Sequence, residues 1–185
     1  MNKVFLFSIA LLIFQKSFCQ KNISIEALSG IGINKELLLV NKKINNYNSF
    51  IFRLNTSYRF KIYEEFFTET GIGAQWHFSS GNIKASEFNS TSLRIGIPII
   101  IGRTLFEKAS AALGVAISNN KDFDKFDFKS DYNLRTSFLL KGNYSIKNNL
   151  DIILVVQKNL SDVPDLYLLN QPNVDISFGV SYKLL

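Results

Sequence analysis

The sequence predicts an all-β protein: an eight-stranded, antiparallel, up-and-down transmembrane β-barrel. Three observations support this prediction. Apolar and polar residues alternate through most of the chain after Ile23, the connections between alternating segments are long and short in turn, and the first nineteen residues resemble a secretory signal. A closed barrel with an apolar outer face and a polar interior is expected to show this alternation of residues and of connection lengths.

The segment from Phe50 to Phe60 shows the residue alternation most clearly. One face carries Phe50, Phe52, Leu54, Thr56, Tyr58 and Phe60, and the opposite face carries Arg53, Asn55, Ser57 and Arg59. A period of two residues is the pattern of a β-strand, whose successive side chains point to opposite faces. The predicted strands, most of them about the length that a tilted strand needs to cross a hydrocarbon core, are Ile23–Ile33, Phe50–Lys61, Phe66–Phe78, Thr91–Ile101, Ala109–Ser118, Tyr132–Ile146, Leu150–Leu160 and Val174–Leu184.

Each strand is expected to turn an apolar row toward lipid. The clearest rows are Ile23, Ile25, Ala27, Ile31 and Ile33 in the first strand, Leu93, Ile95, Ile97, Ile99 and Ile101 in the fourth, Tyr132, Leu134, Thr136, Phe138 and Leu140 in the sixth, and Val174, Ile176, Phe178, Val180, Tyr182 and Leu184 in the last. No charged residue lies at the middle of these rows, where a basic residue would cost about 2–4 kcal/mol. The seventh strand fits least, because Ile153 and Val155 fall on its polar face.

The connections predict the topology. The long, polar ones are Asn34–Ser49, Ser79–Ser90, Asn119–Asp131 and Ser161–Asn173, and the short ones are Ile62–Glu65, Gly102–Lys108 and Lys147–Asn149. This regular alternation is typical of an outer-membrane barrel with tight periplasmic turns and long external loops. A soluble, lipocalin-like barrel also alternates with period two, but with its apolar face inward. The charges on the polar faces and the aromatic residues near the strand ends favour the membrane form.

The first nineteen residues are expected to be a signal peptide, leaving 20–185 as one barrel domain. Lys3 precedes an apolar run from Val4 to Phe14, and Ser17 to Cys19 offers a cleavage site before Gln20. Cys19 is an alternative lipid acceptor, although Lys16 and Phe18 fit a lipoprotein signal poorly. If cleavage follows Cys19, the mature chain has no cysteine for a disulfide or a metal site.

The formal charge is +6, from 21 basic and 15 acidic residues. The basic residues are scattered through strands and connections rather than clustered, which argues against nucleic-acid binding. No phosphate-binding glycine loop, metal-ligand cluster or nucleotide motif is present, so no cofactor is expected.

Three segments resemble the small outer-membrane β-barrel family of Bacteroidota that is often called PorT-like. They are Leu93–Ile101, which contains the Ile-Pro-Ile-Ile stretch, Phe67–Gly71 with its glutamate, and the closing segment Ile176–Leu184. The resemblance implies an integral outer-membrane barrel, and one member of that family takes part in protein secretion. Leu184-Leu185 stands where that family usually has a terminal aromatic residue.

Two groups of charged residues are expected inside the barrel. Glu26, Arg59 and Glu69 are predicted to form a charge cluster that plugs the lumen, with Arg59 diagonally across from Glu69 and Glu26 at a similar height on its other side. The alternative is an ion or proton path. Arg53, Arg94 and Arg135 are predicted to make the upper lumen basic, partly balanced by Asp175. They would either pack the lumen or contact an anion or a lipopolysaccharide phosphate.

Two further features suggest more specific activities. His77, Ser79 and Glu87 could form a base–nucleophile–acid set and partly resemble the His-x-Ser-Asn stretch of lipid A 3-O-deacylases, but Ser80 replaces the Asn and the set lies on different strands. The connection Asn119–Ser130 alternates Phe and Asp residues and could bind a cation or a partner, although an exposed hairpin explains it as well.

The function predicted from the sequence is therefore that of a non-enzymatic outer-membrane protein with a structural, adhesive or secretion-accessory role. The alternatives are a lipid A-modifying hydrolase that uses His77 and Ser79, and a narrow passive conduit. The expected partners are outer-membrane lipid, lipopolysaccharide and the outer-membrane assembly machinery, and the expected state is a monomer.

Overall fold

The computed structural model describes residues 22–33, 38–39, 42–43, 45–83, 86–122, 133–160 and 174–184. The predicted signal segment, Cys19 and Tyr132 lie outside these residues, as does most of the Asp- and Phe-rich connection at residues 123–130.

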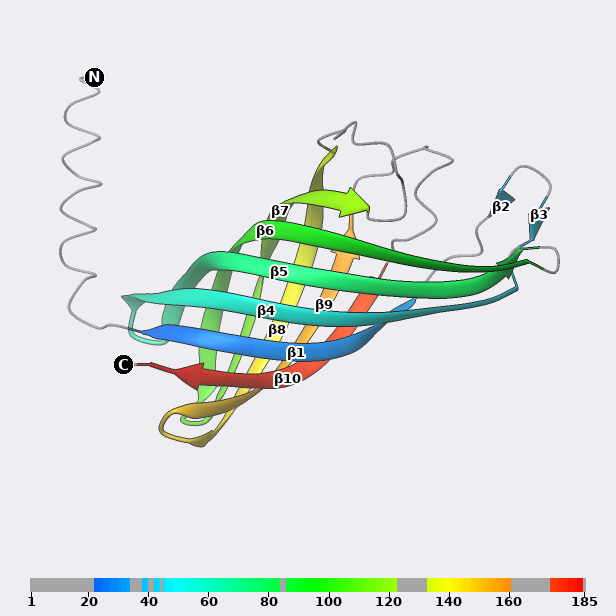
Figure 1. Ribbon diagram of the computed structural model, residues 1–185. Coiled ribbons are helices and arrows are strands. Elements are labelled where there is room, and N and C mark those ends of the chain that lie inside the picture. Colours follow the sequence, from blue (N-terminus) through cyan, green and yellow to red (C-terminus); the bar gives the residue numbers. More distant parts are fainter. Residues whose placement is uncertain are drawn as a thin grey trace, which may run out of the picture.

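Eight strands close into one antiparallel barrel, as the sequence predicted (Figure 1). The strands are β1 (Ile23–Ile33), β4 (Asn45–Tyr63), β5 (Phe66–Ile83), β6 (Ser86–Phe106), β7 (Ala109–Asp122), β8 (Asn133–Lys147), β9 (Leu150–Asn159) and β10 (Val174–Lys183). Sequence neighbours pair around the barrel, and β1 closes it by pairing with both β4 and β10. A separate two-stranded pairing joins β2 (Leu38–Leu39) to β3 (Lys42–Lys43).

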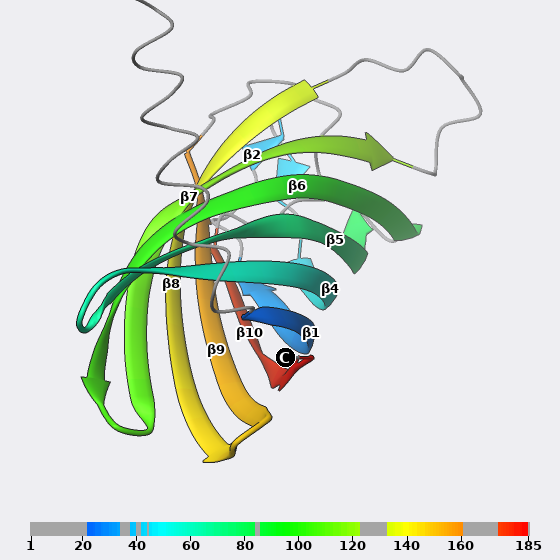
Figure 2. The same cartoon turned by 90° about the vertical axis from the view of Figure 1, so that its left-hand side faces the viewer.

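The short connections are tighter than predicted. Two-residue turns at Glu64–Glu65, 107–108 and 148–149 join β4 to β5, β6 to β7, and β8 to β9. Glu64 has a φ of 30°, so the first of these turns requires a left-handed backbone. The backbone N–H of Leu184 donates to Ile23 O at 2.8 Å. The two ends of the barrel domain therefore meet at the same end as the tight turns, and Figure 2 shows the C-terminus beside β1.

Four neighbouring strands are longer, at the ends away from the tight turns, than the sequence predicted: β7 continues through residues 119–122, and the other three extend further. Residues 45–49, 79–83 and 86–90 were expected in long connections, but they extend β4, β5 and β6 beyond the rest of the barrel (Figure 1). Pairing continues there, for example between Ser79 and Ser90 and between Asn82 and Glu87. Backbone hydrogen bonding does not need an apolar face, so the ladder continues past the point where the hydrophobic alternation stops.

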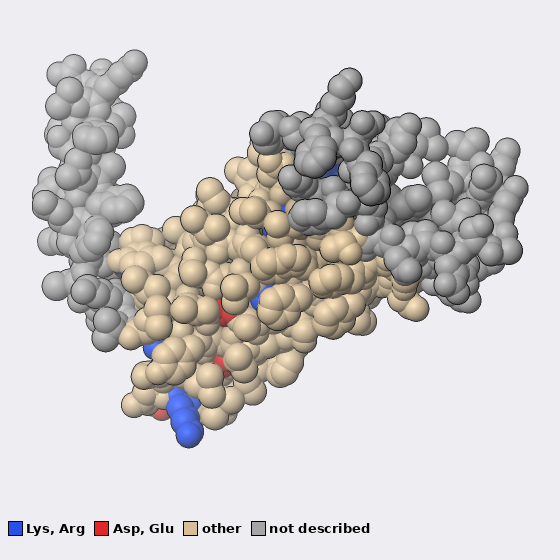
Figure 3. Space-filling model, viewed as in Figure 1, with Lys and Arg blue, Asp and Glu red and all other residues tan. Residues whose placement is uncertain are grey.

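The side chains are distributed inside out. Large apolar residues are exposed on the outer face, including Ile31 and Ile97, whose exposed fractions are 59% and 53%. The residues buried inside the barrel include Glu26, Arg53, His77 and Asp175. The face in Figure 3 accordingly shows few charged side chains among its described residues. This is the arrangement of a transmembrane β-barrel, with lipid-facing and lumen-facing residues alternating along every strand. Among the described residues, no helix has the length and apolar character to cross a membrane.

The interior is not polar throughout, contrary to the expectation from the sequence. Buried apolar side chains form a cluster inside the barrel, made of Leu28, Phe67, Ile100, Ala112, Ala116, Leu139, Ile153 and Val155. Ile153 and Val155 lie on the lumen face, as their positions in the alternation require, and are 0% and 6% exposed. The seventh predicted strand fitted the pattern poorly only because the prediction required every lumen-facing residue to be polar. An eight-stranded interior is narrow enough for side chains to fill it.

Candidate functional site: the barrel lumen

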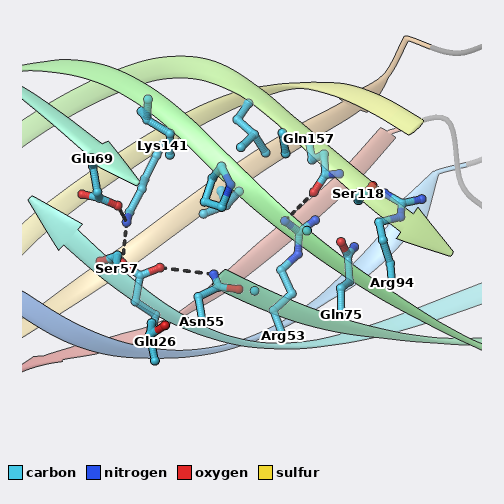
Figure 4. Close-up of a pocket in the computed structure, with 18 residues that line it drawn as sticks. Glu26, Arg53, Asn55, Ser57, Glu69, Gln75, Arg94, Ser118, Lys141 and Gln157 are labelled. Carbon is cyan, nitrogen blue, oxygen red and sulfur yellow. Dashed lines mark hydrogen bonds and ion pairs between the residues drawn. The ribbon is translucent and has the colours of Figure 1, made fainter. Parts of the chain in front are cut away.

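A charged cluster lies in the lower lumen, the half nearer the tight turns. The Lys141 ammonium group, on β8, forms ion pairs with the carboxylates of both Glu26 on β1 and Glu69 on β5 (Figure 4). Arg59 contacts the other oxygen of Glu69, with Nε and Nη2 at 3.2 and 3.0 Å from Oε2. The cluster thus contains two cations and two carboxylates, and Lys141 links β8 to β1 and β5, three strands that are not neighbours in the sheet.

Polar neighbours complete the environment of Glu26. Ser57 Oγ donates to Glu26 Oε1 at 3.1 Å, and Asn55 Nδ2 donates to Glu26 Oε2 at 3.2 Å. Burying a charge is costly unless it is paired and hydrogen-bonded. Glu26 is both, which accounts for its being 3% exposed.

The structure brings Glu26, Arg59 and Glu69 into one region, but with different contacts from those predicted. Arg59 pairs directly opposite Glu69, not diagonally, because the register shifts by one residue between Lys61 and Tyr63, next to the turn. The ion pair to Glu26 comes from Lys141. Lys141 follows Leu140 of the lipid-facing row, so the alternation places it on the lumen face, but the alternation does not predict its ion pairs. Contacts between strands on opposite sides of the lumen depend on the register of the whole closed barrel.

Two further contacts lie near the lower end. Lys183 pairs with Asp151 at 2.9 Å, and Ser145 Oγ donates to the same Asp151 oxygen at 2.6 Å. The Arg59 guanidinium stacks over the Phe67 ring at 4.0 Å from its centroid. This contact connects the charged cluster to the apolar cluster.

A second polar cluster lies in the upper lumen. Arg53 Nη2 lies 3.2 Å from Asp175 Oδ2, and Arg53 Nη1 donates to Gln157 Oε1 at 2.7 Å. Gln75 donates to the same Asp175 oxygen at 2.8 Å. Arg94 donates to Asn159 Oδ1 at 3.0 Å. These bonds connect residues of β4, β5, β6, β9 and β10 across the barrel.

The three arginines predicted for the upper lumen all lie inside it. Arg53, Arg94 and Arg135 are 5%, 2% and 4% exposed. Electrostatic interactions connect all three to His77, and connect Asp175 to Arg53 and Arg94.

A cavity of about 60 Å³ lies between the two polar clusters. Its lower part is lined by Glu26, Ser57, Glu69 and Lys141, and its upper part by Arg53, Gln75, Arg94, Ser118 and Gln157 (Figure 4). The apolar residues Ile100, Ala116, Leu139 and Val155 also line it. One buried water needs about 10–15 Å³ of such volume, so the cavity has room for a few waters.

His77 and Ser79 do not form a base–nucleophile pair in this structure. His77 is 0% exposed, and neither of its ring nitrogens has a hydrogen-bond partner. Ser79 Oγ donates to Ser49 Oγ at 3.4 Å. Both side chains point into the lumen, away from the lipid-facing surface. The Glu87 side chain is not among those the structure describes.

Metal ligands are not grouped in the part of the chain that the structure describes, where no three His, Cys, Asp or Glu side chains converge. The carboxylates proposed for a cation site in the connection after β7 are Asp122, Asp124 and Asp127. Asp124 and Asp127 lie outside the described residues, and only the backbone of Asp122 is described.

Comparisons with solved structures relate the fold of the chain to transmembrane and outer-membrane proteins. No family model and no curated protein matches the sequence. A de novo designed transmembrane β-barrel superposes with a TM-score of 0.47 and 9% identity, covering 89% of this chain and 98% of the design. The attachment invasion locus protein Ail of Yersinia pestis, solved in complex with the heparin analogue sucrose octasulfate, superposes with a TM-score of 0.44 and 16% identity. The match covers 88% of this chain and 97% of the Ail chain. An outer-membrane channel from Pseudomonas putida F1 superposes with a TM-score of 0.43 and 8% identity, and the match covers 88% of this chain and 95% of the channel.

Proposed function

We propose that this chain is an integral outer-membrane protein with a non-enzymatic role: structural, adhesive or accessory to secretion. In this proposal the barrel is a plugged anchor. It holds the extended ends of β4, β5 and β6 and the long connections on the external side of the membrane. Residues 1–19 direct export and are removed, and the barrel inserts as a monomer through the assembly machinery, in contact with lipid and lipopolysaccharide. Membership of the PorT-like family is part of the same proposal.

The observation that supports this proposal most directly is the cross-linked lumen. Lys141 connects β8 to β1 and β5, and Arg53 connects β4 to β9 and β10. Such bonds span the interior among the described residues, beside a cavity of about 60 Å³. A barrel filled in this way is suited to anchoring external segments rather than to passing solutes.

Neither alternative function has comparable support. A lipid A hydrolase that uses His77 and Ser79 needs a nucleophile activated by hydrogen bonding to its base, and His77 makes no hydrogen bond. A passive conduit needs a continuous polar path. In this barrel, ion pairs and apolar side chains such as Phe67 and Ile153 occupy the lumen instead.

Conductance in a planar lipid bilayer tests the plugged barrel. We expect purified, folded protein to show no stable step of porin size, because its lumen lacks a continuous aqueous path. A channel-forming porin inserted under the same conditions controls for the recording. A reproducible, defined conductance step from the wild-type protein would favour the conduit and contradict the plugged anchor.

A further inference from the structure

Two residues that line the cavity between the polar clusters contain buried atoms with no hydrogen-bond partner among the described residues. The residues are Ser118 and Arg53, and the atoms are Oγ of the serine and Nε of the arginine. The two residues are 4% and 5% exposed. Buried polar groups are nearly always hydrogen-bonded, either to protein or to ordered water. These two atoms therefore indicate that the cavity has an occupant.

A third hydrogen-bond donor lies in the lower part of the cavity. The Lys141 ammonium group has three N–H donors, and its contacts with the carboxylates of Glu26 and Glu69 use two of them. Lys141 lines the cavity and is 6% exposed. Its third N–H is thus available to a group inside the cavity.

The ion pairs beside the cavity favour a neutral occupant. Lys141 contacts two carboxylates, and Arg53 Nη2 lies 3.2 Å from Asp175 Oδ2. Both cations that offer a donor to the cavity therefore already have a carboxylate partner. A neutral molecule that both donates and accepts hydrogen bonds would satisfy the Ser118 hydroxyl and the two N–H groups. It would do so without adding a charge to a buried site, where an unpaired charge is costly.

The size of the cavity is suited to water. Its volume is about 60 Å³, and one buried water takes about 10–15 Å³ of such volume, so a few molecules fit. A buried water makes about three hydrogen bonds. The lining offers polar groups in both parts, including Ser118 and Arg53 in the upper part and Lys141 in the lower part (Figure 4).

We propose that the cavity is a binding site for a small cluster of ordered waters, which hydrogen-bond to Ser118 Oγ, Arg53 Nε and Lys141 Nζ. The waters accept hydrogen bonds from the two cationic side chains and either donate to or accept from the hydroxyl group. The two polar clusters are then joined into one hydrogen-bonded network inside the barrel. This hydration does not depend on the role of the external segments.

A crystal structure of the folded protein grown in sodium bromide, at a resolution that shows ordered waters elsewhere on the protein, tests the occupant directly. We expect water density within hydrogen-bond distance of Ser118 Oγ, at about 2.5–3.0 Å, and no anomalous bromide peak in the cavity. A cavity without ordered density overturns the proposal. A bromide peak in the cavity also overturns it, because the occupant would then be an anion.

The substitution Ser118→Ala tests the same water in solution, through the sign of its effect on stability. If the hydroxyl group binds water, its removal should lower the folding equilibrium constant about two- to tenfold, the range for a single hydrogen bond. If the hydroxyl group is buried without any partner, its removal should raise this constant, because an unsatisfied buried polar group is unfavourable. Denaturant titration in detergent micelles measures the constant.

Ser137→Ala calibrates this measurement. Ser137 is also buried in the lumen, at 0% exposed, and its Oγ accepts a hydrogen bond from Gln157 Nε2 at 2.8 Å. This variant should therefore be destabilised whether or not the cavity contains water. If Ser118→Ala is as stable as the wild-type protein or more stable, while Ser137→Ala is destabilised, the bound water is contradicted.

Discussion

At the scale of single residues, Lys141 is the group on which two buried carboxylates depend. Its ammonium group contacts both Glu26 and Glu69, and all three side chains are almost fully buried. Glu69 also has Arg59, whereas the other contacts of Glu26 are neutral. Removing Lys141 would therefore leave Glu26 as a buried charge with no cation beside it.

The substitution Lys141→Met tests this dependence. Methionine keeps much of the length of the side chain but removes the charge, so we expect a loss of about 3–5 kcal/mol in the free energy of unfolding, as when one partner of a buried pair is removed. Arg103→Met is the matched control, because Arg103 and its partner Glu65 are 56% and 54% exposed and their ion pair is screened by solvent. Its loss should be about 1 kcal/mol or less. Denaturant titration in detergent micelles measures both, and equal losses would contradict the bridging role.

At the scale of elements, the hydrophobic alternation predicts the strands and their inner faces. It assigns Arg53, Arg94 and Arg135 to the lumen without any knowledge of contacts. It does not predict the outer ends of β4, β5 and β6, because those ends are paired through the backbone and lack an apolar row. Nor does it predict that Lys141 meets Glu26, which depends on how all eight strands are staggered.

Pro98 interrupts the pairing between β5 and β6. Thr104 N–H donates to Glu65 O, so even-numbered residues of β6 turn their backbone groups toward β5. By the same register Pro98 lies opposite Gly71. The β5–β6 ladder is interrupted there, between the pair Thr70–Ile99 and the pair Gly73–Gly96. Proline has no N–H to donate to the ladder. The backbone hydrogen bonding between β5 and β6 is therefore interrupted beside the cavity, which Pro98 also lines.

Restoring a backbone N–H at position 98 should close the gap in the β5–β6 ladder. In Pro98→Ala, the new amide at position 98 can donate to Gly71 O, and we expect amide exchange at Gly71 to slow about two- to tenfold, as one added hydrogen bond allows. Hydrogen exchange followed by NMR in micelles measures the rate. Ile97→Ala serves as the control, because the amide of residue 97 faces β7 and Pro98 is retained. Unchanged exchange at Gly71 in Pro98→Ala would mean that the ladder is already closed there.

At the scale of the whole molecule, the outer surface identifies the medium that the barrel occupies. Ile95, Ile97, Ile99 and Ile101 are each at least half exposed on one face of β6. The exposed rows of β1, β7 and β10 add Ile31, Leu113 and Phe178 at 59%, 56% and 57%. Exposed apolar residues in continuous rows around a closed sheet would be an aggregation hazard in water, but they match a hydrocarbon environment.

An arginine placed on this surface should be costly only where lipid tails touch it. We expect Ile99→Arg, within the apolar row of β6, to lower the free energy of unfolding by about 2–4 kcal/mol, and Phe106→Arg, beside the tight turn, to lower it by about 0–1 kcal/mol. Both positions are exposed, at 50% and 74%, so loss of buried packing does not explain the difference. Guanidinium titration in phospholipid vesicles measures the two free energies. Equal costs at the two positions would show that the isoleucine row does not lie in the hydrocarbon core, and would remove the physical basis for a membrane-spanning barrel.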